Sequence, residues 1–149
     1  MTEGLMTVHP GAIGPTAEII RQQWGHEASL RYVDEALAGI LSKRWTVFAA
    51  LGPCEVGVGA LVKLDIDYDL WSITWLVVHQ DYRRRGIGRR LVCQLELQAV
   101  ADSKLYPGNC AVMELTTTVP EFYEVRGYRR VAEVGRGFLM VKNLTGVAP

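Results

Sequence analysis

Five arginines and two glycines crowd the octet Arg83–Arg90, which reads RRRGIGRR. The octet follows an apolar stretch, Trp75–Val78, and precedes a pattern in which Ile87, Leu91 and Leu95 recur at every fourth residue. This order predicts a strand, a glycine turn and a helix. The first N–H groups of a helix lack partners and attract anions, and glycines let a phosphate approach the main chain closely. Phosphate binding is therefore the first functional hypothesis.

Chain length and composition limit the classes of protein to which this chain could belong. The chain has 149 residues, which suits one domain with a substantial core, and its 16 basic and 16 acidic side chains cancel. Zero net charge gives no general affinity for nucleic acid or for membranes. The longest apolar region, Val47–Val62, is broken by glycine and proline, and the N-terminal segment lacks the pattern of a secretory signal. Cys54, Cys93 and Cys110 have no zinc or disulfide spacing, which favours buried free thiols in a cytoplasmic protein.

Periodicity and turn residues predict the secondary structure. Pro15 suits the first turn of a helix that Gly25 ends, and the apolar residues of the next helix, Leu30, Val33, Leu37, Ile40 and Leu41, form one stripe. A third helix follows the glycine turn and ends near Lys104. A short helix is expected at Pro120–Arg126. Strands are expected near Met6–His9 and at Trp45–Leu51, Glu55–Asp65, Leu70–Val78, Cys110–Thr116, Tyr128–Val134 and Gly137–Asn143.

Two well-known phosphate-binding turns do not fit the octet. A dinucleotide-binding turn needs a third glycine and a later acidic residue, and a Walker loop needs Lys-Ser or Lys-Thr after its last glycine. The sequence instead has R-x-x-G-x-G, Arg83–Gly88, within VVHQDYRRRGIGRRL. This motif resembles the acyl-CoA-binding signature of the GNAT superfamily of N-acyltransferases. The segment Val119–Val131, VPEFYEVRGYRRV, resembles the second signature of that family, a short helix with F-Y-x-x-x-G-F/Y.

The resemblance extends over nearly the whole chain and implies the fold. The expected element order, β-α-α-β-β-β-α-β-α-β-β, is also the order of the family. We therefore expect a single α/β (α+β) domain over residues 1–149, with a GNAT-like, mixed and mostly antiparallel sheet. A homodimer through the closing strands is compatible with the resemblance.

The resemblance implies acetyl-CoA as the cosubstrate and an amine, on a small molecule or a protein, as the acceptor. The backbone of Leu76, Val77 and Val78 would bind the pantetheine arm and the acyl carbonyl. Main-chain amides of the turn would bind the pyrophosphate, with guanidinium groups adding charge-assisted hydrogen bonds. The residues implied in this turn are Arg83, Arg84, Arg85, Gly86, Ile87, Gly88 and Arg89.

Tyr123 and Glu114 are the principal candidates for proton transfer. Tyr123 matches the family's tyrosine at the acid position and would protonate the departing thiolate, although it could equally pack in its helix or bind the cofactor sulfur. Glu114 matches the point at which related N-terminal acetyltransferases carry a base, and a strand glutamate on a solvated face is the alternative. His79 could relay a proton or be an ordinary loop histidine. We expect no metal, because the histidines lack partners at ligand spacing.

Other interpretations stay open at this stage. Asp65, Asp67 and Asp69 alternate and could attract a cationic amine, but aspartates are also common in hairpin turns. Nucleic-acid binding through the arginines ranks lower, because the chain has no basic stripe or aromatic platform. A non-catalytic acyl-CoA-binding sensor on the same fold is the principal alternative to an enzyme.

Overall fold

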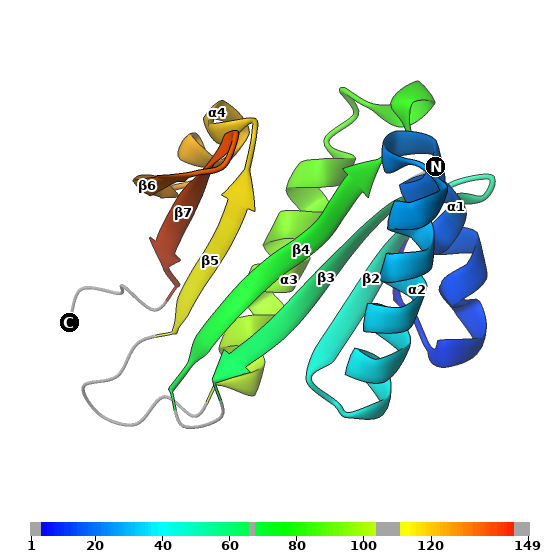
Figure 1. The fold of residues 1–149 in the computed structure, drawn as a ribbon, viewed down its shortest axis with the longest axis horizontal. Helices are drawn as coiled ribbons and strands as arrows, with labels where there is room; N and C mark the ends of the chain where they lie inside the picture. Colours follow the sequence, from blue (N-terminus) through cyan, green and yellow to red (C-terminus); the bar gives the residue numbers. More distant parts are fainter. Residues whose placement is uncertain (1–3, 66–67, 104–110, 145–149) are drawn as a thin grey trace. The chain divides into compact units, whose positions relative to one another are not determined.

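The computed structural model describes residues 4–65, 68–103 and 111–144. The chain forms two compact units, each built from two stretches of chain. The first unit comprises Met1–Val62 and Ile73–Leu95, and the second comprises Lys63–Ser72 and Glu96–Pro149. The sheet is mixed and mostly antiparallel, as predicted, and its strands follow the order β1-β2-β3-β4-β5-β7-β6 (Figure 1). Strands β3 and β4 and helix α3 each contribute residues to both units.

The elements agree closely with the sequence-based expectation. Strands β2, β3, β4 and β7 have the predicted bounds, and the other boundaries shift by a few residues because helix and strand ends are weakly specified. Lys104 and Cys110, at two predicted boundaries, lie outside the described residues. The bounds are β1 Gly4–Thr7, α1 Ile13–Trp24, α2 His26–Leu41, β2 Trp45–Leu51, β3 Glu55–Asp65, β4 Leu70–Val78, α3 Ile87–Asp102, β5 Val112–Thr117, α4 Pro120–Glu124, β6 Arg129–Val134 and β7 Gly137–Asn143, with 3₁₀ turns at Pro10–Ala12 and Gln80–Tyr82.

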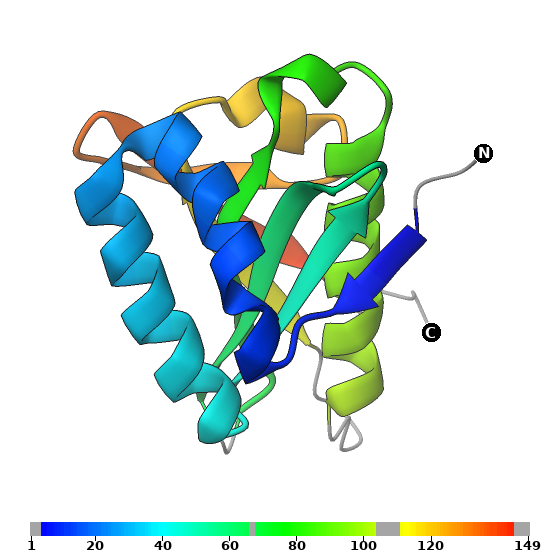
Figure 2. The same ribbon diagram turned by 90° about the vertical axis from the view of Figure 1, so that its right-hand side faces the viewer.

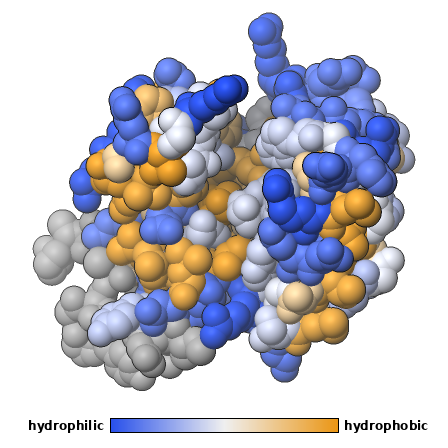
Figure 3. Space-filling view, viewed as in Figure 1, coloured by the Kyte–Doolittle hydropathy of each residue, from blue (hydrophilic) through white to orange (hydrophobic). Residues whose placement is uncertain are grey.

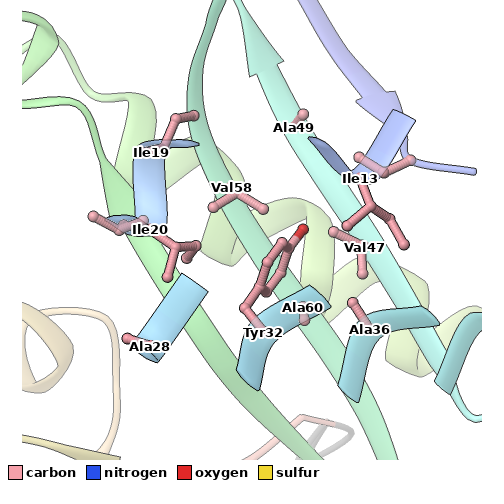
Figure 4. Packing of buried hydrophobic residues seen from close by; sticks show 12 residues of the cluster. Ile13, Ile19, Ile20, Ala28, Tyr32, Ala36, Val47, Ala49, Val58 and Ala60 are labelled. Atoms are coloured by element: carbon pink, nitrogen blue, oxygen red, sulfur yellow. The ribbon is translucent and has the colours of Figure 1, made fainter. Parts of the chain in front are cut away.

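In the first unit, helices cover both faces of the strands. Helices α1 and α2 lie on one face of β2 and β3, and the first part of α3 lies on the other (Figure 2). Tyr32 of α2 is fully buried and points toward Val47, Val58 and Ala60 of the strands (Figure 4). Its hydroxyl shares a 2.6 Å hydrogen bond with Thr16 of α1. This buried polar pair fixes the two helices against each other and against the sheet.

Strand β3 makes room for α3 with residues that have no side chain. A Cβ atom on Gly57 would lie 3.1 Å from both Ile87 and Leu91 of the helix. A Cβ on Gly59 would lie 2.9 Å from Leu76 and 3.0 Å from Leu95. The helix therefore approaches the sheet more closely than side chains on these strand positions would permit.

The predicted apolar stripe of α2 is only partly buried, because Val33 and Ile40 pack against the core whereas the three leucines do not. Leu30, Leu37 and Leu41 are 53%, 39% and 66% exposed, and Figure 3 shows orange, hydrophobic side chains over this helix. The buried face instead consists of the smaller residues Ala28, Ser29, Ala36 and Gly39 with Tyr32. Apolar periodicity alone selected the longest side chains, whereas close packing of a helix on a sheet selected the small ones.

The second unit is built around β5 and β7, which pair antiparallel from Val112 with Asn143 to Thr117 with Phe138. Strand β6 pairs antiparallel with β7 and completes this edge. The first residues of β4, Leu70–Ser72, pair parallel with Val112–Glu114 of β5. This parallel pairing is the point at which the antiparallel meander of the sheet gives way to a crossover through α3.

The expected burial of the cysteines was wrong for the two that the structure describes. Cys54 and Cys93 are both exposed. Cys93 lies on α3, away from the stripe formed by Ile87, Leu91 and Leu95, so the helical rotation carries it out of the core. Cys110 lies outside the described residues.

Candidate functional site

The glycine turn adopts the conformation that an anion site requires. Arg84 and Gly86 have φ angles of 65° and 79°, both in the left-handed region, and Arg90 donates its N–H to the carbonyl of Gly86 at 3.0 Å. Gly86 therefore caps the N-terminus of α3. Among the described residues, the N–H groups from Arg84 to Arg89 have no main-chain acceptor. The turn presents a run of unpaired donors at the positive end of a helix.

The arginines around the turn fall into different environments. Arg83 is engaged within the protein: its Nε donates to the carbonyl of Val78 at 3.0 Å, and its Nη2 donates to Gln23 of α1. The Arg85 guanidinium lies 5.0 Å from the ring centroid of Tyr82. Arg84 and Arg89 are not buried. Arg84, Arg85 and Arg89 therefore keep their guanidinium N–H groups available to a phosphate, whereas Arg83 shapes the end of β4.

Strand β4 has an irregular backbone angle just before the residues expected to bind the cofactor arm. Trp75 has a φ of 54°, an unusual angle for an aromatic residue in a strand. Its indole Nε1 donates to Glu35 of α2 at 3.0 Å, and its ring meets those of Trp24 and Tyr32 edge to face. These contacts hold the irregularity in place. Local strain of this kind clusters at functional sites.

A cavity of about 390 Å³ adjoins the end of β4 in the first unit. It combines apolar walls from Val77 and Val78 with polar groups from α1 and from the following 3₁₀ turn. His79 begins that turn by accepting a hydrogen bond at Nδ1 from the N–H of Asp81. This bond explains His79 as a loop residue. The cavity is lined by Ile19, Arg21, Gln22, Gln23, Val77, Val78, His79, Gln80 and Asp81.

In the second unit, two neighbouring tyrosines have different hydroxyl environments. The ring of Tyr123 on α4 lies edge to face with the ring of Tyr128, 5.6 Å between centroids, and both side chains are buried. The Tyr128 hydroxyl donates to Glu96 at 2.7 Å, and Lys142 binds both oxygens of the same carboxylate. Tyr123 has no hydrogen-bond partner for its hydroxyl among the described residues, and this oxygen is not among the buried unsatisfied atoms. It is thus open to a ligand or to solvent.

Burial controls the acidity of Tyr123. Burial of its ring raises the pKa of Tyr123 to about 12, while the nearby positive charge of Arg126 lowers it. Glu114 lies on β5, half-buried, opposite Ser72 of β4 and Val141 of β7. Both proton-transfer candidates thus belong to the second unit, and all of the expected cofactor-binding residues belong to the first.

The segment that contains these residues matches a known family. The family described as acetyltransferase (GNAT) domain matches residues 43–130. The chain belongs to the GNAT acetyltransferase family. This match contains the glycine turn, β5 and α4, and therefore includes every expected site residue. None of the curated proteins matches the chain.

Solved structures of GNAT proteins share the fold. A putative GNAT acetyltransferase from Desulfovibrio desulfuricans superposes with a TM-score of 0.79 at 13% identity, covering 97% of this chain and 100% of its own. The PaiA N-acetyltransferase from Thermoplasma acidophilum, in complex with coenzyme A, gives 0.77 at 15% identity, with coverage of 96% and 99%. An aminoglycoside 6'-N-acetyltransferase complexed with coenzyme A gives 0.76 at 18% identity, with coverage of 98% and 99%.

Several features of this GNAT chain were not anticipated from its sequence. The bond from Arg83 to Gln23 joins residues 60 positions apart, and no local pattern announces it. Arg126, near the end of α4, carries a buried Nε without a partner among the described residues.

Within the described part of the chain, no three His, Cys, Asp or Glu side chains gather as metal ligands. No described helix is both long and apolar enough to cross a membrane.

Proposed function

We propose that this GNAT protein is an acetyl-CoA-dependent N-acetyltransferase that moves the acetyl group to a primary amine. The observation that carries the proposal is the run of unpaired N–H groups from Arg84 to Arg89, opened by the left-handed Gly86. A diphosphate fits this set of donors because it offers several oxygens to adjacent amides at a helix N-terminus. Acetyl-CoA supplies such a diphosphate together with an activated thioester.

The remaining site residues have separate roles in this proposal. The accessible guanidinium groups of Arg84 and Arg89 form charge-assisted hydrogen bonds with phosphate oxygens. The main chain of Leu76–Val78 binds the pantetheine arm, and the N–H of Val78 or of a neighbour polarises the thioester carbonyl. Arg83 holds the carbonyl of Val78 and so keeps this strand end in one conformation.

The chemistry proceeds by direct attack of the neutral amine on the thioester carbon, without a covalent enzyme intermediate. Glu114 accepts the proton of the attacking amine, directly or through water, and Tyr123 donates its proton to the departing thiolate. Tyr123 suits this role because its ring is buried while its hydroxyl is not tied to a described protein group. A protonated hydroxyl is then available at neutral pH.

The test combines binding with turnover. Calorimetry should detect acetyl-CoA and CoA, with much weaker binding of a pantetheine thioester that lacks the diphosphate. Release of free CoA thiol should depend on the amine in a panel of polyamines, amino acids, aminoglycosides and peptide N-termini or lysines. Absence of CoA binding would overturn the proposal. Binding of CoA without acetylation of any amine would favour an acyl-CoA sensor.

A further inference from the structure

The side chain of Arg126 is held against helix α4 in an unusual way. Its main-chain N–H donates to the carbonyl of Tyr123 at 2.9 Å, and its Nη1 donates to the carbonyl of Phe122 at 2.5 Å. The guanidinium carbon lies 3.8 Å from the centroid of the Phe122 ring. The two side-chain contacts hold the guanidinium over one aromatic face, a geometry in which a cation and a ring attract each other.

This position carries an energetic cost. The Nε of Arg126 is buried and finds no hydrogen-bond partner among the described residues. A buried donor without a partner destabilises the folded state, and an apolar side chain could cover Phe122 without that penalty. The packing of α4 therefore does not explain why a guanidinium group occupies this site.

The charged groups around Tyr123 indicate what Arg126 acts on. Tyr128, which packs on Tyr123, is tied to Glu96, and Glu96 is in turn paired with Lys142. On α4 and β6, Glu124 and Glu121 pair with Arg130. Each of these carboxylates thus already has a cationic partner, Arg130 being shared by two of them. Arg126 has no carboxylate partner among the described residues. Its guanidinium lies on the ring of Phe122, which meets the ring of Tyr123 edge to face with 4.9 Å between centroids. The positive charge of Arg126 accordingly lowers the pKa of Tyr123, against the larger effect of burial.

We propose that Arg126 is a positioning residue for Tyr123, and that its fixed positive charge stabilises the phenolate that forms when Tyr123 gives up its proton. This inference rests on the proposed function, in which Tyr123 is the acid. The Tyr123 O–H bond breaks, its proton joins the thiolate sulfur released from the acetyl group, and the negative charge passes to the phenolate oxygen. Solvent then returns a proton to Tyr123, which its unpaired hydroxyl permits.

A titration tests the electrostatic part without any turnover. A fluorinated tyrosine at position 123 has a more acidic phenol and a fluorine signal that reports its ionisation. Arg126→Gln removes the charge while keeping a side-chain donor for the Phe122 carbonyl, so we expect the titration midpoint to move to higher pH. Arg129→Leu, which removes an exposed charge on β6, should leave the midpoint in place. An unchanged midpoint in Arg126→Gln would overturn the inference.

Kinetics test the consequence for the reaction. We expect Arg126→Gln to lower kcat about three- to tenfold with little change in either KM, and Arg126→Lys to recover part of the loss. In a Tyr123→Phe background, Arg126→Gln should have no further effect on kcat. An equal loss in both backgrounds would mean that Arg126 acts through packing and would reject the positioning role. Full activity in Tyr123→Phe would instead reject Tyr123 as the acid, while the titration would still report on Arg126.

Discussion

Arg83 donates its Nε–H to the main-chain carbonyl of Val78, 3.0 Å away. The first residue of the R-x-x-G-x-G motif therefore links the turn to the last residue of β4 by a hydrogen bond. Because its Nη2 also binds Gln23, the same side chain joins α1 to this strand end. The resemblance to the family implied a cofactor contact for Arg83, and the internal bonds add a structural role to that prediction.

The first prediction separates the two roles of the arginines. Arg84→Ala removes an accessible guanidinium, so we expect CoA to bind about tenfold more weakly, with a smaller dependence of the affinity on salt. Arg83→Ala should lower the free energy of unfolding by about 1 kcal/mol, because it removes hydrogen bonds from a solvent-exposed side chain. Calorimetry at two salt concentrations and urea denaturation measure these effects. Weaker CoA binding in Arg83→Ala with unchanged stability would contradict the structural role that we assign to its bonds with Val78 and Gln23.

The second prediction concerns Gly86 and its φ of 79°. Gly86→Glu places a bulky anionic group beside the unpaired main-chain N–H groups of the turn, so CoA binding should become undetectable by calorimetry. The left-handed backbone adds a cost of about 1–2 kcal/mol, which should lower stability without unfolding the protein. Gly135, in the β6–β7 turn with a φ of 57° and open space around it, is the matched control. Gly135→Glu should carry similar strain and bind CoA normally, and equal losses in both variants would exclude a local effect at the turn.

The third prediction follows from the pKa of Tyr123, which burial raises to about 12. An acid must hold its proton to act, and Tyr123 stays protonated at all pH values well below its pKa. We therefore expect kcat to rise as the amine loses its proton and then to stay level up to about pH 10. A pH profile of acetyl transfer measures this. A fall in kcat between about pH 8 and about pH 10 that disappears in Tyr123→Phe would show that the phenol ionises too early for this account.

The fourth prediction is a loss of stability at alkaline pH. Burial raises the pKa of Tyr32 to about 12 and that of Tyr123 to about 12, and it raises the pKa of Tyr128 further with help from the negative charge of Glu96. In the unfolded chain these phenols ionise near pH 10. Their contribution is therefore fully present below about pH 10 and is lost as the pH rises toward about 12, by up to about 1.4 kcal/mol per tyrosine and pH unit. Urea denaturation between about pH 8 and about pH 11 measures the slope, which Tyr32→Phe should reduce.

Much of the fold could be predicted from local patterns. Strands β2, β3 and β4 are rich in β-branched and aromatic residues and are bounded by turn residues, and Gly25, with a φ of 97°, ends α1 as expected. The residues of α2 that are most deeply buried could not be predicted, since the choice between its leucines and its small residues depends on the width of the space between the helix and the strands. That width is a property of the assembled sheet.

In the candidate site, too, some features could be predicted from the sequence and others could not. The turn at Gly86 could be predicted, because two glycines between a strand and a helix favour a tight turn. Phosphate binding at this turn stays a prediction. The environment of Arg126 could not be predicted, because its Nε burial depends on how the side chain folds over Phe122. The sequence likewise does not show which tyrosine hydroxyl is free. In the structure, the Tyr128 hydroxyl is bound to Glu96, whereas the Tyr123 hydroxyl has no partner among the described residues.

The glycines of β3 determine how closely helix α3 packs on the sheet. A methyl group on Gly57 would press on Ile87, the first residue of α3, and on Leu91 one turn later. Relief of that pressure would lift the start of the helix and carry the donor groups of the turn with it, about thirty residues away along the chain. The absence of a side chain at Gly57 thereby helps to set the position of the turn that we propose binds a diphosphate.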